Sequence, residues 1–296
     1  MNKKRTGPAA LNTRGAAVSK SRGSVALNAP YLLWSLLFIA APLAMVAVFA
    51  FTDASGHFTL SVFGGLFETE ESRRMLSRVF GDSLRYALYA TAICLVLAFP
   101  LAHVMAHTKA STQRTLMMLI MVPMWMNFLI CTYSWRTILE THGIINTFLG
   151  ALHLPNLKLL NTPGAVILGM VYNYLPFMIL PIYTVMARMD VSLVEAAQDL
   201  GANRLSVLRR ITMPLSVPGV VSGVTMVFVP SVSTFYISQK LGGRGSLIGD
   251  LIELQFLGAA NYQVGAALSM ILMVIVLICM MVMRRFSDRE EGAFLA

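Results

Sequence analysis

Charged residues are scarce in this chain. Asp, Glu, Lys and Arg make up 12% of its 296 residues, whereas hydrophobic residues make up 56%. Ordinary soluble domains carry about 25% charged and about 45–50% apolar residues. The composition therefore disfavours a soluble protein and indicates a chain that spends much of its length inside a membrane.

Cysteine is also rare in the sequence. The three cysteines, Cys94, Cys131 and Cys279, all lie in long apolar runs, where a thiol behaves as a small apolar side chain. No disulfide framework is expected from them.

Motifs that mark several enzyme classes are absent. No G-x-x-x-x-G-K-[ST] segment is present, so the chain is not expected to bind ATP itself. Gly242-Gly243-Arg244-Gly245 lacks the lysine of a phosphate-binding loop and is interpreted as a turn. His103 and His107 have the i, i+4 spacing of a helical metal site. Without a third ligand nearby, they are interpreted as histidines at the membrane interface.

Six apolar runs of helical length dominate what is present. Each has about 20 residues, which is enough to cross roughly 30 Å of hydrocarbon, and none alternates as a barrel strand would. The predicted fold is therefore all-α, with six transmembrane helices. The expected spans are Tyr31–Phe51, Ser83–Ala106, Thr115–Arg136, Ala165–Met186, Gly219–Gln239 and Val264–Met283. Between the first two, the polar segment from Glu68 to Arg78 is expected to form a short helix along the surface.

The chain is basic despite its low charge content, with a net charge of +9. Its basic residues flank the apolar runs and form no stripe interleaved with aromatic residues, so nucleic-acid binding is not expected. Residues 1–30 contain basic residues and no acid, as a transit peptide would, but a basic tail that holds the first helix inside is preferred. With that tail inside, most Lys and Arg residues fall on the cytoplasmic side. Both termini and the segment 187–218 are therefore expected to be cytoplasmic.

That polar segment carries a helix–glycine–helix pattern. Leu193, Ala196, Ala197 and Leu200 share one helical face, and Glu195, Gln198 and Asp199 are set apart from them. Gly201 can end this helix in a left-handed conformation, and Asn203 can cap a second helix over Leu205–Arg210. Pro214 is expected to limit that second helix. Such a hairpin at a membrane surface suits docking into a groove on another protein.

Polar residues within the spans have mainly structural interpretations. Arg136 and Glu140 lie one helical turn apart and are expected to form an ion pair at the end of the third span. Tyr133 and Trp135 are interpreted as interfacial anchors or as pore lining. Asn127 and Asn173 are expected to hydrogen-bond between helices.

The sequence resembles the permease subunits of type I ABC importers. Glu195-Ala196-Ala197, followed by Gly201 and Pro214, is similar to their EAA loop. Further segments resemble the spermidine/putrescine permeases, in particular the first-subunit type. These are Val122–Trp125 and Tyr133–Arg136 in the third span, Gly169–Tyr172, Leu175–Met178 and Pro181–Tyr183 in the fourth, and Leu241–Gly243, Ile248–Asp250 and Gln255–Leu257 before the last.

The resemblance implies a non-catalytic subunit of a bacterial inner-membrane importer. It implies a cytoplasmic tail over 1–30, a six-helix permease domain over 31–286 and a second cytoplasmic tail over 287–296. The implied partners are two copies of an ATPase, which bind the ATP, a second permease in a heterodimer and an extracytoplasmic substrate-binding protein, besides membrane lipid. The residues implied to contact the ATPase are Glu195, Ala196, Ala197, Gly201, Arg204 and Arg209.

A polyamine substrate would be bound by carboxylates and aromatic faces. Candidate pathway residues are Trp135, Glu140, Tyr172, Tyr236, Asp250 and Glu253. The chain departs from the family at Ser238-Gln239-Lys240, where relatives often place an acid before the Gly-Gly turn. Opines, thiamine, ferric iron or an oxyanion therefore remain alternative substrates. An ion-coupled secondary transporter would need an intramembrane acid, and a membrane enzyme would need a polar catalytic cluster. Neither is evident.

Overall fold

A computed structural model describes residues 30–53, 55–243 and 247–294, with side chains up to residue 285. Within these residues the chain is helical, and its one β contact is an isolated bridge between Thr52 and Phe58. The predicted all-α class is confirmed. The predicted tail over 1–30 lies outside the described residues except for Pro30.

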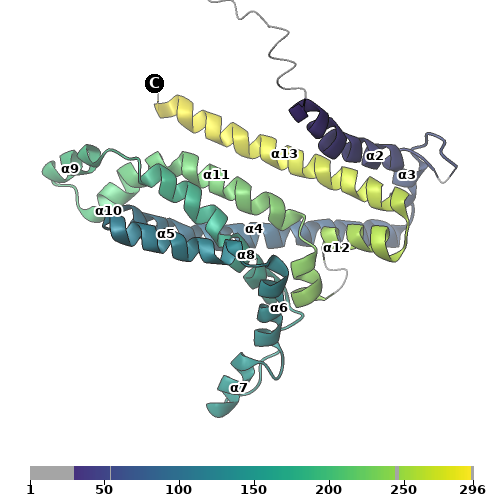
Figure 1. Ribbon diagram of the computed structural model, residues 1–296, viewed down its shortest axis with the longest axis horizontal. Coiled ribbons are helices and arrows are strands. Elements are labelled where there is room, and N and C mark those ends of the chain that lie inside the picture. The colour runs from purple at the N-terminus through teal and green to yellow at the C-terminus, as the bar shows by residue number, and fades with distance from the viewer. Residues whose placement is uncertain (1–29, 54, 244–246, 295–296) are drawn as a thin grey trace, which may run out of the picture. The chain divides into compact units, whose positions relative to one another are not determined.

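Residues 30–35 are helical, and twelve α-helices, numbered from α2, and four short π-helical segments, marked η, follow them; Figure 1 labels these α-helices. They are η1 (Leu36–Ala40), α2 (Ala41–Ala50), α3 (Ser61–Glu68), α4 (Glu70–Ala106), α5 (Ala110–Trp125), α6 (Phe128–Leu139), α7 (Ile144–Ala151), α8 (Pro163–Met186), α9 (Val191–Asp199), α10 (Arg204–Val207), η2 (Leu208–Thr212), α11 (Met213–Val232), η3 (Ser238–Gly242), α12 (Ile248–Glu253), η4 (Leu254–Gly258) and α13 (Tyr262–Phe294).

Five described helices are long and apolar enough to cross a membrane. They are Pro30–Ala50, Glu70–Ala106, Pro163–Met186, Arg204–Val232 and Tyr262–Arg285. A sixth candidate crossing is the pair Ala110–Trp125 and Phe128–Ala151, whose axes meet at 90°. The predicted number of six holds when this bent pair is counted as one crossing. The first helix belongs, up to Met45, to a compact unit separate from the rest of the chain.

The third predicted span is the one that differs most from the structure. Thr115–Arg136 was expected to be one helix, but α5 ends at Trp125 and α6 begins at Phe128. Pro123 removes one helical hydrogen bond near this break. The backbone is extended at Asn127, whose Oδ1 accepts a hydrogen bond from the Leu129 N–H at 2.8 Å and so caps α6.

The predicted role of both span asparagines was therefore wrong. Asn127 caps its own following helix rather than joining two helices. Asn173 Nδ2 donates to the Gly169 carbonyl at 2.8 Å, one turn earlier in the same helix α8. In each case a local backbone group is close enough to compete with a partner on another helix.

Two further expectations are corrected by helix boundaries. The segment from Glu68 to Arg78 does not form a separate surface helix, because α4 runs unbroken from Glu70 to Ala106. Glu70 and Glu71 favour this start by placing acids in the first turn. The fifth span, predicted as Gly219–Gln239, ends at Val232, and residues 233–235 leave the helix before η3 begins.

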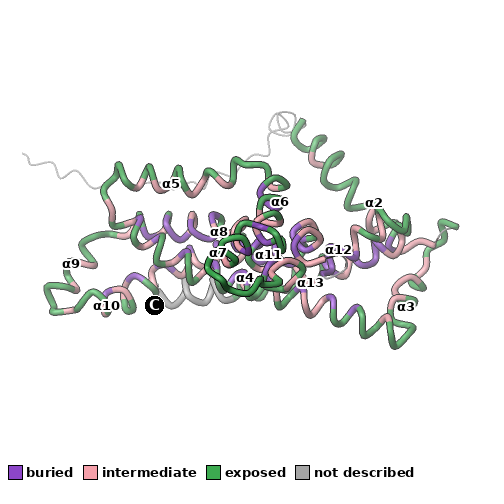
Figure 2. The backbone as a smooth tube through the Cα atoms, turned by 90° about the horizontal axis from the view of Figure 1, so that it is seen from below, coloured by how far each residue is buried: buried purple, intermediate pink, exposed green. Residues whose placement is uncertain are grey.

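Small residues allow the central helices to pack closely. Ala90, Cys94, Ala98 and Ala102 recur every fourth residue along α4 and are fully buried in the core shared with α8. On α11, a Cβ built on Gly219 would lie only 2.8 Å from the Pro181 carbonyl oxygen of α8. Interfaces of this kind are typical of membrane helices, which gain van der Waals contact by close backbone approach. Figure 2 shows the buried segments gathered along α8 and α11.

Candidate functional sites

The predicted helix–glycine–helix segment forms a hairpin, defined here as residues 190–212. Asp190 caps α9 by accepting the Ser192 N–H at 3.0 Å, and this backbone hydrogen bond lowers the pKa of the Asp190 carboxyl below its usual value. Gly201 follows α9 with φ +84°, which confirms the predicted left-handed helix end. Asn203 accepts the Ser206 N–H at 2.8 Å and caps α10, which is also as predicted.

The second arm of the hairpin continues directly into α11, so the expected limit at Pro214 was wrong. The π-helical turn η2 joins α10 to α11 without a break, and the whole segment Arg204–Val232 forms one candidate span. Pro214 lies in the first turn of α11, where a missing amide hydrogen costs little. The hairpin is therefore rigidly connected to a core helix.

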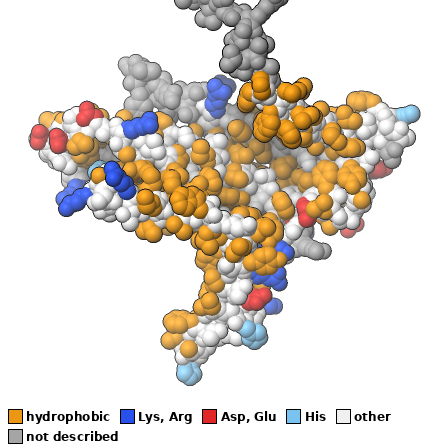
Figure 3. Space-filling model, in the orientation of Figure 1, with side chains coloured by type: hydrophobic (Ala, Val, Ile, Leu, Met, Phe, Trp, Pro, Cys, Tyr) orange, Lys and Arg blue, Asp and Glu red, His pale blue; other side chains and the backbone are white. Residues whose placement is uncertain are grey.

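The apolar face of the hairpin has no partner in the described chain. Leu193, Ala196 and Leu200 are all exposed, and the Leu200 side chain is 90% exposed. A concavity of about 440 Å³ lies between the two arms and is lined in part by Ala197, Leu200 and Gly201. Figure 3 shows acidic and basic side chains gathered around α9 and α10, whereas hydrophobic side chains cover the body of the molecule. An exposed apolar surface rimmed by charge is typical of a docking site.

The predicted coupling residues all lie on this hairpin, but on different sides of it. Ala196 and Ala197 lie on or beside the apolar face, whereas the exposed Glu195 projects away from it. Arg204 begins α10, and Arg209 is exposed on η2. The structure thus brings the predicted set together within one short segment.

The predicted aromatic residues meet where α6, α8 and η3 pack together. Trp135 on α6 contacts Tyr172 on α8 edge-on, with ring centroids 5.4 Å apart. The ring centroid of Tyr236, just before η3, lies 6.3 Å from that of Tyr133 on α6. Phe128 adds a third ring, whose centroid lies 5.8 Å from that of Tyr236. Tyr133 was interpreted from the sequence as an interfacial anchor or as pore lining, and Phe128 was not predicted. The available signal for Phe128 was its position on the same short helix as Tyr133 and Trp135.

The predicted acidic residues do not form one cluster. Glu140 forms an ion pair with Arg136 on α6, with 3.7 Å between Oε1 and Nε, as the sequence predicted. Asp250 is 2% exposed, and its Oδ2 accepts hydrogen bonds from the Leu247 N–H and the Ser238 hydroxyl. It caps α12 and ties that helix to η3.

Glu253 also joins α12 to η3, one turn after Asp250. Its Oε2 accepts a hydrogen bond from Gln239 Nε2 at 2.7 Å. Glu253 and Gln239 are both only partly buried, so this pair lies at the border of the packed region. Two of the three predicted acids therefore position η3, and the third holds the end of α6.

Lys240 is placed against the aromatic residues. Its Nζ lies 5.2 Å from the ring centroid of Tyr133 and 5.6 Å from that of Tyr236. Both distances are within the range of a cation–π interaction. The residue that departs from the family pattern thus occupies the aromatic faces that a cationic ligand would use.

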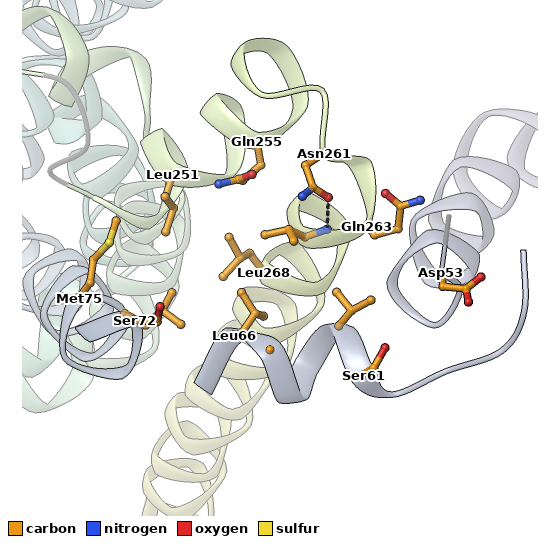
Figure 4. A pocket seen from close by; sticks show the side chains of 14 residues that line it. Asp53, Ser61, Leu66, Ser72, Met75, Leu251, Gln255, Asn261, Gln263 and Leu268 are labelled. Atoms are coloured by element: carbon orange, nitrogen blue, oxygen red, sulfur yellow. Dashed lines mark hydrogen bonds between the residues drawn. The ribbon is translucent and has the colours of Figure 1, made fainter. Parts of the chain in front are cut away.

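A separate pocket of about 490 Å³ lies between α3, α4, α12 and α13. Figure 4 shows Leu66, Leu251 and Leu268 on one part of its wall and the polar side chains of Gln255 and Gln263 on another. No residue of the predicted pathway lines it.

His103 and His107, which have the spacing of a helical metal site, have ring centroids 4.3 Å apart. No third metal-ligating side chain joins them within the described residues.

The architecture matches the membrane subunits of ABC importers. The chain superposes on a bacterial ABC transporter involved in the import of the acidic polysaccharide alginate, with a TM-score of 0.73 and 19% identity, over 90% of this chain and 95% of the other. It also matches the MetNI methionine ABC transporter in an inward-facing conformation, with a TM-score of 0.55 and 18% identity, over 76% and 98% of the two chains. At these identities the likeness shows the fold: that of an ABC-importer permease.

The chain belongs to the family described as binding-protein-dependent transport system inner membrane components, whose model matches residues 95–290. It is therefore a multi-pass inner-membrane transport subunit and not a catalyst.

The relatives of the chain include permeases of polyamine transport systems. The chain is 36% identical to the spermidine/putrescine transport system permease protein PotB of Escherichia coli, over 86% of this chain and 94% of that protein. It is 34% identical to PotB of Haemophilus influenzae, over 85% and 90% of the two chains. The inner membrane ABC transporter permease protein YdcU of Escherichia coli is 29% identical, over 72% and 71%.

Proposed function

We propose that this chain is a permease subunit of an ATP-driven polyamine importer and forms half of the pathway for spermidine and putrescine. The observation that carries this proposal is the 36% identity to a spermidine/putrescine permease over nearly the full length of both chains. The aromatic cluster at α6, α8 and η3 supports it, because aromatic faces bind organic ammonium groups.

The proposed complex contains two copies of an ATPase, a second permease and an extracytoplasmic binding protein. The unpartnered apolar face of the hairpin supports contact with the ATPase, since small residues there permit close approach. The contact set is Glu195, Ala196, Ala197, Gly201, Arg204 and Arg209. ATP is bound by the ATPase and not by this chain.

Coupling follows from the connection between the hairpin and α11. ATP binding draws the two ATPase copies together and displaces the hairpins that they hold. Because α10, η2 and α11 form one continuous segment, this displacement passes to α11 and to α8, against which it packs. Alternating access then requires that the closed ATPase binds the outward-facing state of the permease more favourably than its inward-facing state.

The pathway is proposed to run past the aromatic cluster. Trp135, Tyr172 and Tyr236 are its proposed aromatic residues. Glu140, which is paired with Arg136, and Glu253, which accepts a hydrogen bond from Gln239, are its proposed acidic residues. Asp250 is assigned a supporting role there, because it is buried at the junction of η3 and α12.

Uptake of a labelled polyamine tests the proposed substrate. The full complex, expressed from this chain and its neighbouring genes in cells without other polyamine importers, is expected to accumulate labelled spermidine only while ATP is available. Unlabelled putrescine should compete. Uptake that follows an ion gradient in proteoliposomes without the ATPase would contradict the proposal, and so would uptake that spermidine does not inhibit.

A second candidate is the same permease role for another substrate. Lys240 favours it, because a positive charge over the aromatic rings opposes the entry of a cation. The competitors in the uptake assay should therefore include an opine, thiamine, a ferric complex and an oxyanion. Inhibition of the complex by one of these, together with no effect of polyamines, would support this alternative.

Both termini and the hairpin are proposed to face the cytoplasm. Gln198 lies on the exposed polar side of α9, so a cysteine placed there should be reached by reagents from the cytoplasmic side. We expect Gln198→Cys to react with an impermeant maleimide in inside-out vesicles and to stay unlabelled in intact cells. Labelling in intact cells would place the hairpin outside and would exclude its contact with the ATPase.

A further inference from the structure

The ammonium group of Lys240 lies between two tyrosines that come from distant parts of the sequence. Tyr133 is on α6 and Tyr236 just precedes η3, with an angle of 68° between their ring planes. Lys240 Nζ lies within 6 Å of both ring centroids. Tyr133 and Tyr236, called here the tyrosine pair, thus form a subsite for one organic cation, and the chain's own side chain fills it.

Carboxylates do not hold Lys240 in this position. Among the described residues its Nζ forms no salt bridge; Glu140 is paired with Arg136, and Glu253 accepts a hydrogen bond from Gln239. Lys240 also forms a side-chain hydrogen bond with Tyr133, but this bond and the two cation–π contacts hold it less tightly than a buried ion pair would, so the lysine can leave the rings at moderate cost. Tyr133 is 48% exposed, and this subsite is therefore open to a competing ligand.

The chemistry of the lysine side chain identifies that competitor. Lysine carries a primary ammonium on a chain of four methylene groups. Putrescine is two primary ammonium groups joined by the same four methylenes, and spermidine ends in such an aminobutyl group. A subsite that accepts the lysine side chain therefore also accepts one end of either polyamine.

We propose that Lys240 is a tethered substrate mimic that occupies the cation subsite of the tyrosine pair until a polyamine displaces it. This inference rests on the proposed polyamine transport and deepens it. A covalently attached competitor acts at a high effective concentration, so it keeps the subsite closed to weakly bound cations. Lys240 thereby weakens binding but selects for ligands with additional ammonium groups that are anchored elsewhere in the pathway.

Equilibrium binding of labelled spermidine to the purified permease–ATPase complex in nanodiscs tests the competition. Lys240→Met keeps an unbranched side chain, one atom shorter, and removes its charge, so we expect about three- to tenfold tighter binding, the range of a single cation–π contact. Lys240→Arg, which still stacks on aromatic rings, should stay close to the unaltered complex. Lys158→Met removes an exposed charge in the segment after α7 and is the matched control, with no expected effect.

Chemical labelling of the amine provides a second readout, one that needs no variant. Addition of spermidine, whose own amines also consume acetic anhydride, should increase the acetylation of Lys240 relative to that of Lys158, because the displaced amine of Lys240 becomes accessible. Weaker binding by Lys240→Met, or labelling of Lys240 relative to Lys158 that spermidine does not change, would overturn the inference. If the Lys240→Met variant fails to accumulate in cells, spermidine binding by Lys240→Gln, together with the labelling result, tests the inference instead. A complex that binds no spermidine at all would instead contradict the proposed substrate.

Discussion

Replacement of Leu200 by glutamate is expected to abolish transport while leaving the permease folded. Leu200 is 90% exposed at the end of α9, so the chain itself loses no packing. If this face lies in a groove of the ATPase, the new carboxylate becomes buried without a partner, which costs about 3 kcal/mol or more. That cost corresponds to a loss of roughly 100-fold or more in affinity. Co-purification of the ATPase and uptake of substrate measure the effect.

Gln198→Glu is the matched control for this variant. It introduces the same carboxylate on the same helix, but on the opposite side from Leu193 and Leu200. We expect Gln198→Glu to retain the ATPase and to transport normally. Equal loss in both variants would show that charge anywhere on α9 is harmful, and normal assembly of Leu200→Glu would refute the docking face.

Replacement of Gly249 by valine is expected to cause the largest loss of stability. A Cβ built on Gly249 lies 2.5 Å from the Thr234 carbonyl oxygen and 2.7 Å from that of Ser233. These are backbone atoms, so no change of rotamer relieves the clash, and α12 must move away from the break that follows α11. Overpacking costs typically about 1–3 kcal/mol, and we expect the upper end or more here.

The consequence should be visible in both stability and function. Displacement of α12 would separate Asp250 from Ser238 and Glu253 from Gln239, so η3 would lose its anchors. We expect a clear fall in the melting temperature of the purified complex and loss of uptake. Gly150→Val on α7 is the control, because nothing lies within 4 Å of a Cβ at that position. Similar melting temperatures for the two variants would contradict the packing argument.

The hairpin and the aromatic site differ in how far local sequence determines their geometry. The hairpin was predictable because its geometry depends on near neighbours: the Asn203 cap acts across three residues, and the Gly201 N–H donates to the Gln198 carbonyl. The aromatic site was only partly predictable. Tyr236 was identified by its residue type, but its contact with Tyr133 depends on how η3 packs beside α6.

The sequence by itself determined that the chain is an all-helical membrane protein with a capped hairpin between its apolar runs. Composition, run length and capping residues act locally, so they can be interpreted without a fold. Only the tertiary structure decided the 90° break before α6, the burial of Asp250 and the position of Lys240 over two tyrosines. The positions of Asp250 and Lys240 depend on contacts between separate segments, and residue type alone does not specify which groups become neighbours. The break has local signals in Pro123 and Asn127, but these do not by themselves fix the angle between α5 and α6.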